Sequence, residues 1–151
     1  MNKIEALDYK SKFAATEHLV IAVDGTPLDV FLESILKDEN HIGLVPAISW
    51  LDNSDERQIA IDKSFPSVGN RTVGPILVCP DDQDFSCTVI VADIETTDTS
   101  IIWHRLGLDK TDLQSPPKIG LDVEWYDQVP ALEFALDDYQ SCMSELENEA
   151  A

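Results

Sequence analysis

Three aspartates in one short segment are the side chains whose spacing best suits chemistry in this chain. Asp81, Asp82 and Asp84 stand between two apolar runs, and clustered carboxylates could hold a hard cation such as Ca²⁺. A DxDxDG calcium loop, however, needs a glycine for its sharp turn and a glutamate at its twelfth position, whereas Cys87 and Thr88 follow here. We therefore interpret the aspartates as turn formers and expect no metal site.

Nucleophilic catalysis would need a cysteine or serine beside a base. The fold could bring Cys79 or Cys87 to His104, but no nucleophile-elbow sequence surrounds either cysteine. His18 and His41 add no HExxH pattern. The chain also lacks GxxxxGK[ST], GxGxxG and GxSxG, the patterns of many nucleotide-binding proteins and hydrolases. We therefore expect neither enzyme activity nor a cofactor.

Negative charge is the strongest signal in the sequence. The chain has 29 Asp and Glu against 10 Lys and Arg, a formal net charge of -19, whereas solubility alone asks for a magnitude of roughly 2 to 8. Residues 119–151 hold nine acids and no Lys or Arg. Nucleic-acid binding is disfavoured, because it needs a basic surface that releases counterions. A dense carboxylate surface instead suits a basic protein partner.

The cysteines and the apolar runs indicate the compartment. Three cysteines, an odd number without CxxC spacing, predict free thiols and no disulfide framework. The longest apolar run is shorter than the roughly 18 residues of a membrane span, and the first residues lack the apolar core of a signal peptide. These features predict a cytoplasmic protein without a membrane partner.

The apolar pattern predicts one α+β domain over residues 1–151. An almost continuous apolar run at residues 89–92 indicates a strand covered on both faces, hence a central strand of a largely antiparallel sheet. β-branched runs predict the stronger strands, and shorter patterns the weaker ones. The stronger strands are expected at 18–23, 73–79, 86–95 and 100–106, and the weaker ones at 47–51 and 57–61. Residues 121–125 alternate between apolar and polar side chains and predict a half-exposed strand.

An early helix is expected at about residues 26–37. Thr26 can cap it, Pro27 suits its first position, and Asp29 completes a spacing like that of a capping box. Its apolar residues recur every three to four positions, so they share one face.

A second helix is expected at about residues 130–147, on an apolar stripe from Leu132 to Leu146. Its last turns carry Glu145 and Glu147 without a compensating cation, although acids there oppose the helix macrodipole. A solvated tail and an acidic rim for a partner both account for these residues.

Three segments of the chain resemble a known class of proteins. Residues 76–91 (ILVCPDDQDFSCTVIV), residues 102–109 (IWHRLGLD), and Val123-Glu124-Trp125 before a helix with Tyr139 are similar to bacterial immunity proteins. These are the cytoplasmic antitoxins of contact-dependent growth inhibition and related polymorphic toxin systems. The resemblance spans about residues 19–146. It implies no enzyme activity and one cognate toxin, often a nuclease, whose active site or substrate cleft is blocked.

Acidic side chains are the candidates for contact with such a basic toxin. Phe85 has two interpretations, because it either staples the hairpin or is an exposed aromatic anchor of an interface. An alternative function, a small cytoplasmic enzyme or metal-dependent regulator, would use the aspartate loop with His104 or Cys87. The expected partner-binding residues are Asp81, Asp82, Asp84 and Phe85 in the loop, and Asp137, Asp138 and Glu145 on the polar side of the last helix.

Two tryptophans and one arginine are expected to act in the scaffold. Trp103 and Trp125 stand at inward positions of strands, where an indole buries a large apolar area. Arg105 follows Trp103 by two residues, so we expect it on the same face, half buried and paired with a carboxylate.

Overall fold

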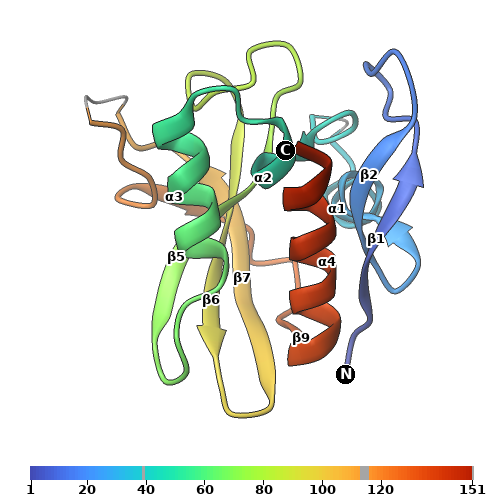
Figure 1. The fold of residues 1–151 in the computed structure, drawn as a ribbon. Coiled ribbons are helices and arrows are strands. Elements are labelled where there is room, and N and C mark those ends of the chain that lie inside the picture. Colours follow the sequence, from blue (N-terminus) through green and yellow to red (C-terminus); the bar gives the residue numbers. More distant parts are fainter. Residues whose placement is uncertain (39, 113–115, 151) are drawn as a thin grey trace.

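The computed structural model describes residues 1–38, 40–112 and 116–150 and confirms the α+β class. Most strands belong to one antiparallel sheet, with an early helix and a C-terminal helix (Figure 1). In chain order, the elements are β1 (Ile4–Tyr9), β2 (His18–Val23), β3 (Thr26–Pro27), α1 (Leu28–Leu36), β4 (Val45–Pro46), α2 (Ala47–Trp50), α3 (Ser54–Ser64), β5 (Arg71–Val78), β6 (Val89–Thr96), β7 (Ser100–Asp109), β8 (Val123–Trp125), β9 (Leu132–Ala135) and α4 (Leu136–Ala150).

The large sheet has the strand order β4-β5-β6-β7-β8, and β9 pairs with β7 as well. All of these pairs are antiparallel, including those of β6 with β5 and β7. The sequence-based expectation of a central strand between two hairpin neighbours is therefore confirmed. Short strands β8 and β9 divide the remaining edge of β7, at residues 107–109 and 100–103.

The central strand β6 separates two apolar clusters, because successive side chains point to opposite faces of a sheet. Ile90, Ala92 and Ile94 belong to the larger cluster, which also contains the buried apolar residues of α1 and α4. Val89 and Val91 belong to the smaller cluster, with residues of α2 and α3 and of the loop after β5. Both faces of β6 are covered, as its composition predicts.

A β-bulge in β7 corrects the expected position of Arg105. Trp103 is paired with Ile94, but Arg105 is paired with Asp93, so His104 is an extra residue. A bulge changes the phase of alternation along a strand. Trp103 is completely buried, whereas the Arg105 side chain is about 50% exposed and contacts Asp93. The prediction that Arg105 shares a face with Trp103 was therefore wrong, and the prediction that it pairs with a carboxylate is confirmed.

A separate three-stranded sheet, β1-β2-β3, was only partly expected. Strand β2 has the predicted bounds, and β1 pairs with it along six residues. Asp24 and Gly25 join β2 to β3 with positive φ angles of 51° and 84°, as a tight hairpin turn requires. Strand β1 was missed, because its apolar residues do not alternate strictly with polar ones and only Ile4 is buried.

Two segments predicted as weak strands are helical. Residues 47–51 contain α2, and residues 57–61 lie inside α3. The Asn53 side chain decides the second case, because its oxygen accepts hydrogen bonds from the amides of Asp55 and Glu56 at 2.9 and 3.1 Å. This N-cap starts a helix at Ser54, in the polar segment between the two expected strands.

Helix α1 starts later than expected. Thr26 and Pro27 form β3, Pro27 is the N-cap residue, and no side chain of the described residues caps the helix. Asp29 is buried and accepts a hydrogen bond from the amide of Gly43 at 2.9 Å, so it joins α1 to a later loop and does not form a capping box. Leu28 and Leu32 are buried, as the apolar stripe predicts.

The C-terminal helix also starts later, at Leu136 and not near residue 130. Residues 132–135 form β9, in which Leu132 and Phe134 are buried and Glu133 is exposed. This period of two belongs to an edge strand on β7. In α4, the buried residues are Tyr139, Cys142, Met143 and Leu146.

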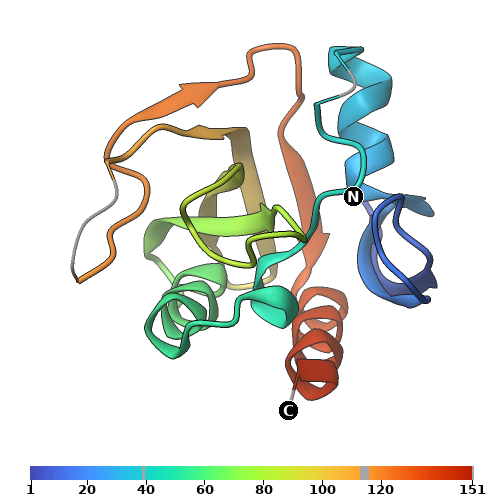
Figure 2. The same cartoon turned by 90° about the horizontal axis from the view of Figure 1, so that it is seen from above.

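Helix α2 lies between α3 and α4 and contacts both, whereas α1 lies beside the small sheet (Figure 2). Within the described residues, no helix combines the length and the apolar character needed to cross a membrane.

Candidate partner-binding site

The loop between β5 and β6, residues 79–88, is held in place by backbone contacts. The Gln83 amide donates to the Cys79 carbonyl at 3.1 Å, which closes a turn at the start of the loop. Gln83 itself has a positive φ of 53°. Its carbonyl accepts a hydrogen bond from the Asp52 amide at 3.0 Å, so the loop is joined to the chain entering α3. We call residues 79–88 the β5–β6 loop.

Phe85 anchors this loop in the smaller apolar cluster. Its side chain is 9% exposed and belongs to the cluster that includes Ala60 and Val91. Its amide donates to Glu56 Oε2 at 3.2 Å. This burial agrees with Phe85 as a hydrophobic staple of the hairpin, so Phe85 is not an exposed aromatic anchor for a partner.

Carboxylates from two distant segments meet at a pocket of about 330 Å³ beside the loop. Asp82 and Asp84 come from the β5–β6 loop, and Asp52 and Glu56 come from the segment that enters α3. Among the described residues that line the pocket there is no lysine or arginine. We call Asp52, Glu56, Asp82 and Asp84, together with lining residues Asn53 and Gln83, the acidic pocket.

Glu56 is the buried member of the acidic pocket. The residue is only 5% exposed, and within the described structure its Oε1 atom has no hydrogen-bond partner. Burial raises the pKa of this carboxyl, the hydrogen bond from the Phe85 amide opposes the rise, and the charge of Asp84 adds to it. A cation placed in the pocket would therefore meet a carboxyl that gains from having its charge balanced.

The predicted loop residues lie together, and the predicted helix residues do not join them. Asp81 and Asp82 are exposed and Asp84 is partly exposed, where a partner can reach them. Asp137 and Asp138 lie in the first turn of α4. Figure 1 shows that this end of α4 is opposite to the end of the molecule that carries the β5–β6 loop. Asp137 and Asp138 therefore form a surface separate from the loop acids, and Glu145 is exposed further along α4, toward its C-terminal end.

Sequence reasoning missed Asp52 and Glu56 as site residues. Both belong to the polar segment at residues 52–56, about 30 residues before the loop. A second acidic segment near an acidic loop was the available signal, but only the packing of α3 on β5 brings the two together.

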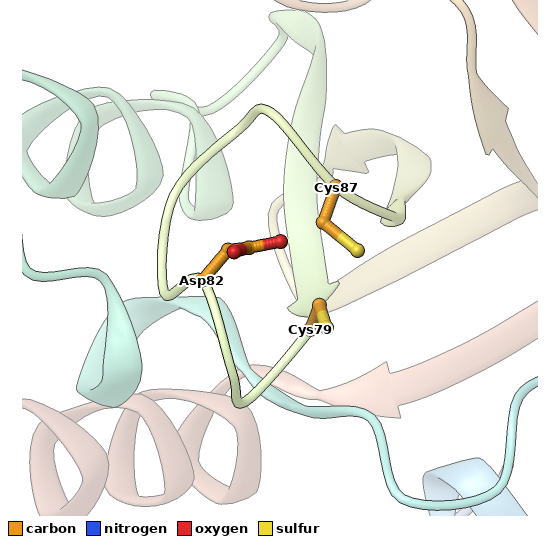
Figure 3. Close-up of side chains that lie close together, drawn as sticks. All are labelled: Cys79, Asp82 and Cys87. Carbon is orange, nitrogen blue, oxygen red and sulfur yellow. The ribbon is translucent and has the colours of Figure 1, made fainter.

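Two thiols and one carboxylate form another cluster in the same loop. Cys79 Sγ, Cys87 Sγ and an Asp82 carboxylate oxygen all lie within 4.8 Å of one another. In Figure 3 the Asp82 side chain points across the loop toward Cys87, and Cys79 lies at the base of the loop. Both cysteines are free thiols, and so is the buried Cys142, as the odd count predicts.

His104 does not take part in this site. Its Nε2 lies 2.7 Å from Glu95 Oε1, on a neighbouring strand. Glu95 is six residues along β6 from Val89, where the β5–β6 loop ends, which is roughly 20 Å in an extended strand. The fold therefore does not assemble Cys87 with His104 as nucleophile and base.

Comparison with known proteins gives no relative for this chain. No family model, no curated protein and no solved structure matches it.

Proposed function

We propose that this chain is an immunity protein, an antitoxin that binds a cognate basic toxin domain, most simply a nuclease, and blocks its active site or substrate cleft. The acidic pocket carries this proposal. Four carboxylates converge there without a cation among the described lining residues. The resemblance of residues 76–91 to immunity proteins covers the same loop.

The pocket suits a lysine or arginine side chain of the toxin. A guanidinium or ammonium group entering it would meet Asp52, Asp82 and Asp84 at its rim and Glu56 at its inner wall. Each charge-assisted hydrogen bond formed there is about twice as strong as a neutral one. The pocket therefore supplies local recognition in addition to long-range attraction.

The net charge acts earlier, during the approach of the two proteins. A field from -19 charges attracts a cationic domain over distances of about a Debye length. Such steering raises the association rate and makes it sensitive to salt. A basic nuclease cleft, built to accept phosphates, is the partner surface that fits both properties. On this proposal the chain has no enzyme activity, acts in the cytoplasm with its toxin, and binds neither nucleic acid nor a membrane.

Two triple variants test the proposal, each as the control of the other. The loop variant carries Asp81→Asn, Asp82→Asn and Asp84→Asn, and the helix variant carries Asp137→Asn, Asp138→Asn and Glu145→Gln. Both remove three charges, so they weaken the long-range field equally, but only the first changes the acidic pocket. The partner used is the product of the adjacent upstream reading frame, which the proposal requires to be a toxin. Association with it is measured by stopped flow at several salt concentrations, and protection is measured by growth on co-expression.

We expect the loop variant to associate more slowly by roughly 3- to 10-fold, since electrostatic steering as a whole spans 10- to 1,000-fold, with a flatter salt dependence and reduced protection. The helix variant should show a smaller change. Equal slowing in both variants would mean that the acids act only through net charge and that the acidic pocket has no separate role. Unchanged rates and unchanged protection in both would refute docking through these acids, and failure of wild type to protect against the toxin would refute the function.

A further inference from the structure

We infer that Cys79, Cys87 and Asp82 form a binding site for a thiophilic divalent cation of the Zn²⁺ type. The inference does not depend on the proposed function. It rests on three donor atoms of different residues that lie within 4.8 Å of one another in one loop (Figure 3).

The donor set determines which ion fits. Two sulfurs and one carboxylate oxygen match the ligands of Zn²⁺, which takes four ligands in a tetrahedron with Zn–S bonds of about 2.3 Å and Zn–O bonds of about 2.0–2.2 Å. Ca²⁺ and Mg²⁺ prefer oxygen ligands and gain little from thiolates. Three protein donors leave the fourth position for water or for a group of a partner.

The loop brings these donors together before any ion arrives. Cys79 follows the last residue of β5, and Cys87 stands two residues before β6. The Gln83 amide bonds to the Cys79 carbonyl, so the chain folds back and presents Asp82 to the two thiols. Buried Phe85 fixes the other half of the loop. The entropy cost of closing the site is therefore already met by the fold.

Exposure permits an ion to enter. Cys87 and Asp82 are exposed, and Cys79 is partly exposed. Binding would convert two thiols to thiolates and release two protons to the solvent, so that the site changes from one negative charge to three before the ion adds two positive charges. The product carries a net charge of about minus one, and no oxidant or reductant is required.

The third donor distinguishes this use from a disulfide. Two neighbouring thiols would be enough to form a disulfide bond, and a carboxylate close to both sulfurs would not contribute to that bond. A second cluster of possible ligands, which includes Asp38 and His41, is less suited, because His41 already bonds Asp38 through Nδ1 at 3.0 Å and the Tyr126 hydroxyl through Nε2 at 2.8 Å.

The test uses the whole chain, reduced with a phosphine and treated with a chelator. Co²⁺ is titrated without oxygen, and the sulfur-to-cobalt charge-transfer absorption in the near ultraviolet is recorded. Zn²⁺ affinity is then measured by competition with a chromophoric chelator. The variants are Cys79→Ser, Cys87→Ser, their double variant and Asp82→Asn. The matched controls are Asp81→Asn, the neighbouring exposed carboxylate, and Cys142→Ala, the thiol remote from the loop.

We expect one Co²⁺ per chain, a thiolate absorption that Zn²⁺ removes, and no change in either control. The double serine variant should lose the absorption and bind Zn²⁺ at least about 100-fold more weakly, since even a residue that only supports a metal ligand is worth about 10- to 100-fold. Circular dichroism of each variant confirms the fold. The inference is overturned by a wild-type chain without the thiolate absorption, by a disulfide that persists in reductant, or by a double variant that binds as well as wild type.

Discussion

The Tyr139 hydroxyl donates a hydrogen bond to the backbone carbonyl of Ser64, so it joins α4 to the last residue of α3. Tyr139 is completely buried, and Trp103 Nε1 lies 3.4 Å from the same hydroxyl oxygen. Burial raises the pKa of Tyr139, which therefore stays neutral. One side chain thus satisfies two buried polar groups.

Replacing Tyr139 by Phe should destabilise the fold although the ring is kept. The change leaves the Ser64 carbonyl and the Trp103 indole without this partner, and each unsatisfied buried group costs about 1–3 kcal/mol. Urea unfolding followed by tryptophan fluorescence measures the loss. A matched control is Phe134→Leu, which removes apolar contact without a hydrogen bond. An unchanged midpoint for Tyr139→Phe would contradict the argument.

Removing the charge of Asp93 should cost less stability than removing the charges of its two arginine partners. Its buried carboxylate accepts hydrogen bonds from Arg71 at 2.8 and 2.9 Å and from Arg105 at 3.0 Å, and both arginine side chains are about half exposed. Asp93→Asn should cost roughly 1.5–3 kcal/mol, the worth of hydrogen bonds to charged groups. Replacing both arginines by Gln should cost more, roughly 2–4 kcal/mol, because a buried charge is then left without a cation. Equal losses by urea unfolding would reject the asymmetry.

The same cluster predicts part of the acid sensitivity. The hydrogen bonds from Arg71 hold the pKa of Asp93 below its ordinary value, and Arg105 adds to this effect. Because the folded pKa is the lower one, this stabilisation is complete above the unfolded pKa of about 3.9 and is lost as the pH falls through the folded value. Between pH 6 and pH 2, stability of wild type should therefore fall more than stability of Asp93→Asn.

Glu56 should have the opposite pH dependence. Burial raises its pKa, so its contribution to stability is lost as the pH rises from about 4.3, the unfolded value, through the folded one. Glu56→Gln keeps an acceptor for the Phe85 amide and removes the buried charge. We expect a higher melting temperature than wild type at pH 7 and no difference at pH 3.5. Asp62→Asn, on the exposed side of the same helix, should show no such trend.

The thiols should not be needed for folding. Cys79→Ala with Cys87→Ala should keep the circular dichroism spectrum of wild type and change stability by about 0.5 kcal/mol or less, as exposed substitutions usually do. Cys142→Ala, in the core at 0% exposure, should cost about 1 kcal/mol or more. Loss of the native fold when reductant is added to wild type would contradict this.

Replacing Gly74 should destabilise the fold for a steric reason alone. A Cβ atom at this position would lie 2.8 Å from the backbone oxygen of Lys63, the carbonyl that also accepts a hydrogen bond from the Thr72 hydroxyl. Gly74→Ala should push α3 away from β5 and cost roughly 1–3 kcal/mol. Thr72→Val, which removes only the hydrogen bond, should cost about 1 kcal/mol. Unfolding midpoints of the two variants compare the effects.

The strands with β-branched runs could be predicted from the sequence, because burial on both faces imposes a composition that is visible locally. Strand β2 and the β5–β6–β7 meander are of this kind. Residues 57–61 could not be predicted as a helix, since Ile59 and Ile61 fit the period of two of a strand. The Asn53 cap and the packing against β5 make this segment helical. Leu132 was ambiguous in the same way, because the free edge of β7 determines that it joins a strand.

Only part of the candidate site could be predicted from the sequence, for a similar reason. Asp82 and Asp84 share one loop, so their proximity is visible in the sequence. The approach of Asp52 and Glu56 to that loop depends on where α3 packs. The phase change at His104 also has no local signal, since a bulge depends on the paired strand as much as on its own.

The contact between the two ends of the chain has a consequence during synthesis. Strand β1 packs on α4, the Asn2 amide bonds to the Glu133 carbonyl at 2.7 Å, and the Leu19 amide bonds to Glu149 Oε2 at 2.8 Å. A ribosome that adds about 5–20 residues per second needs roughly 6–26 s to make the intervening 130 residues. For that time the apolar face of the β1–β2 hairpin has no α4 to cover it, so this face stays exposed until the last part of the chain has been made.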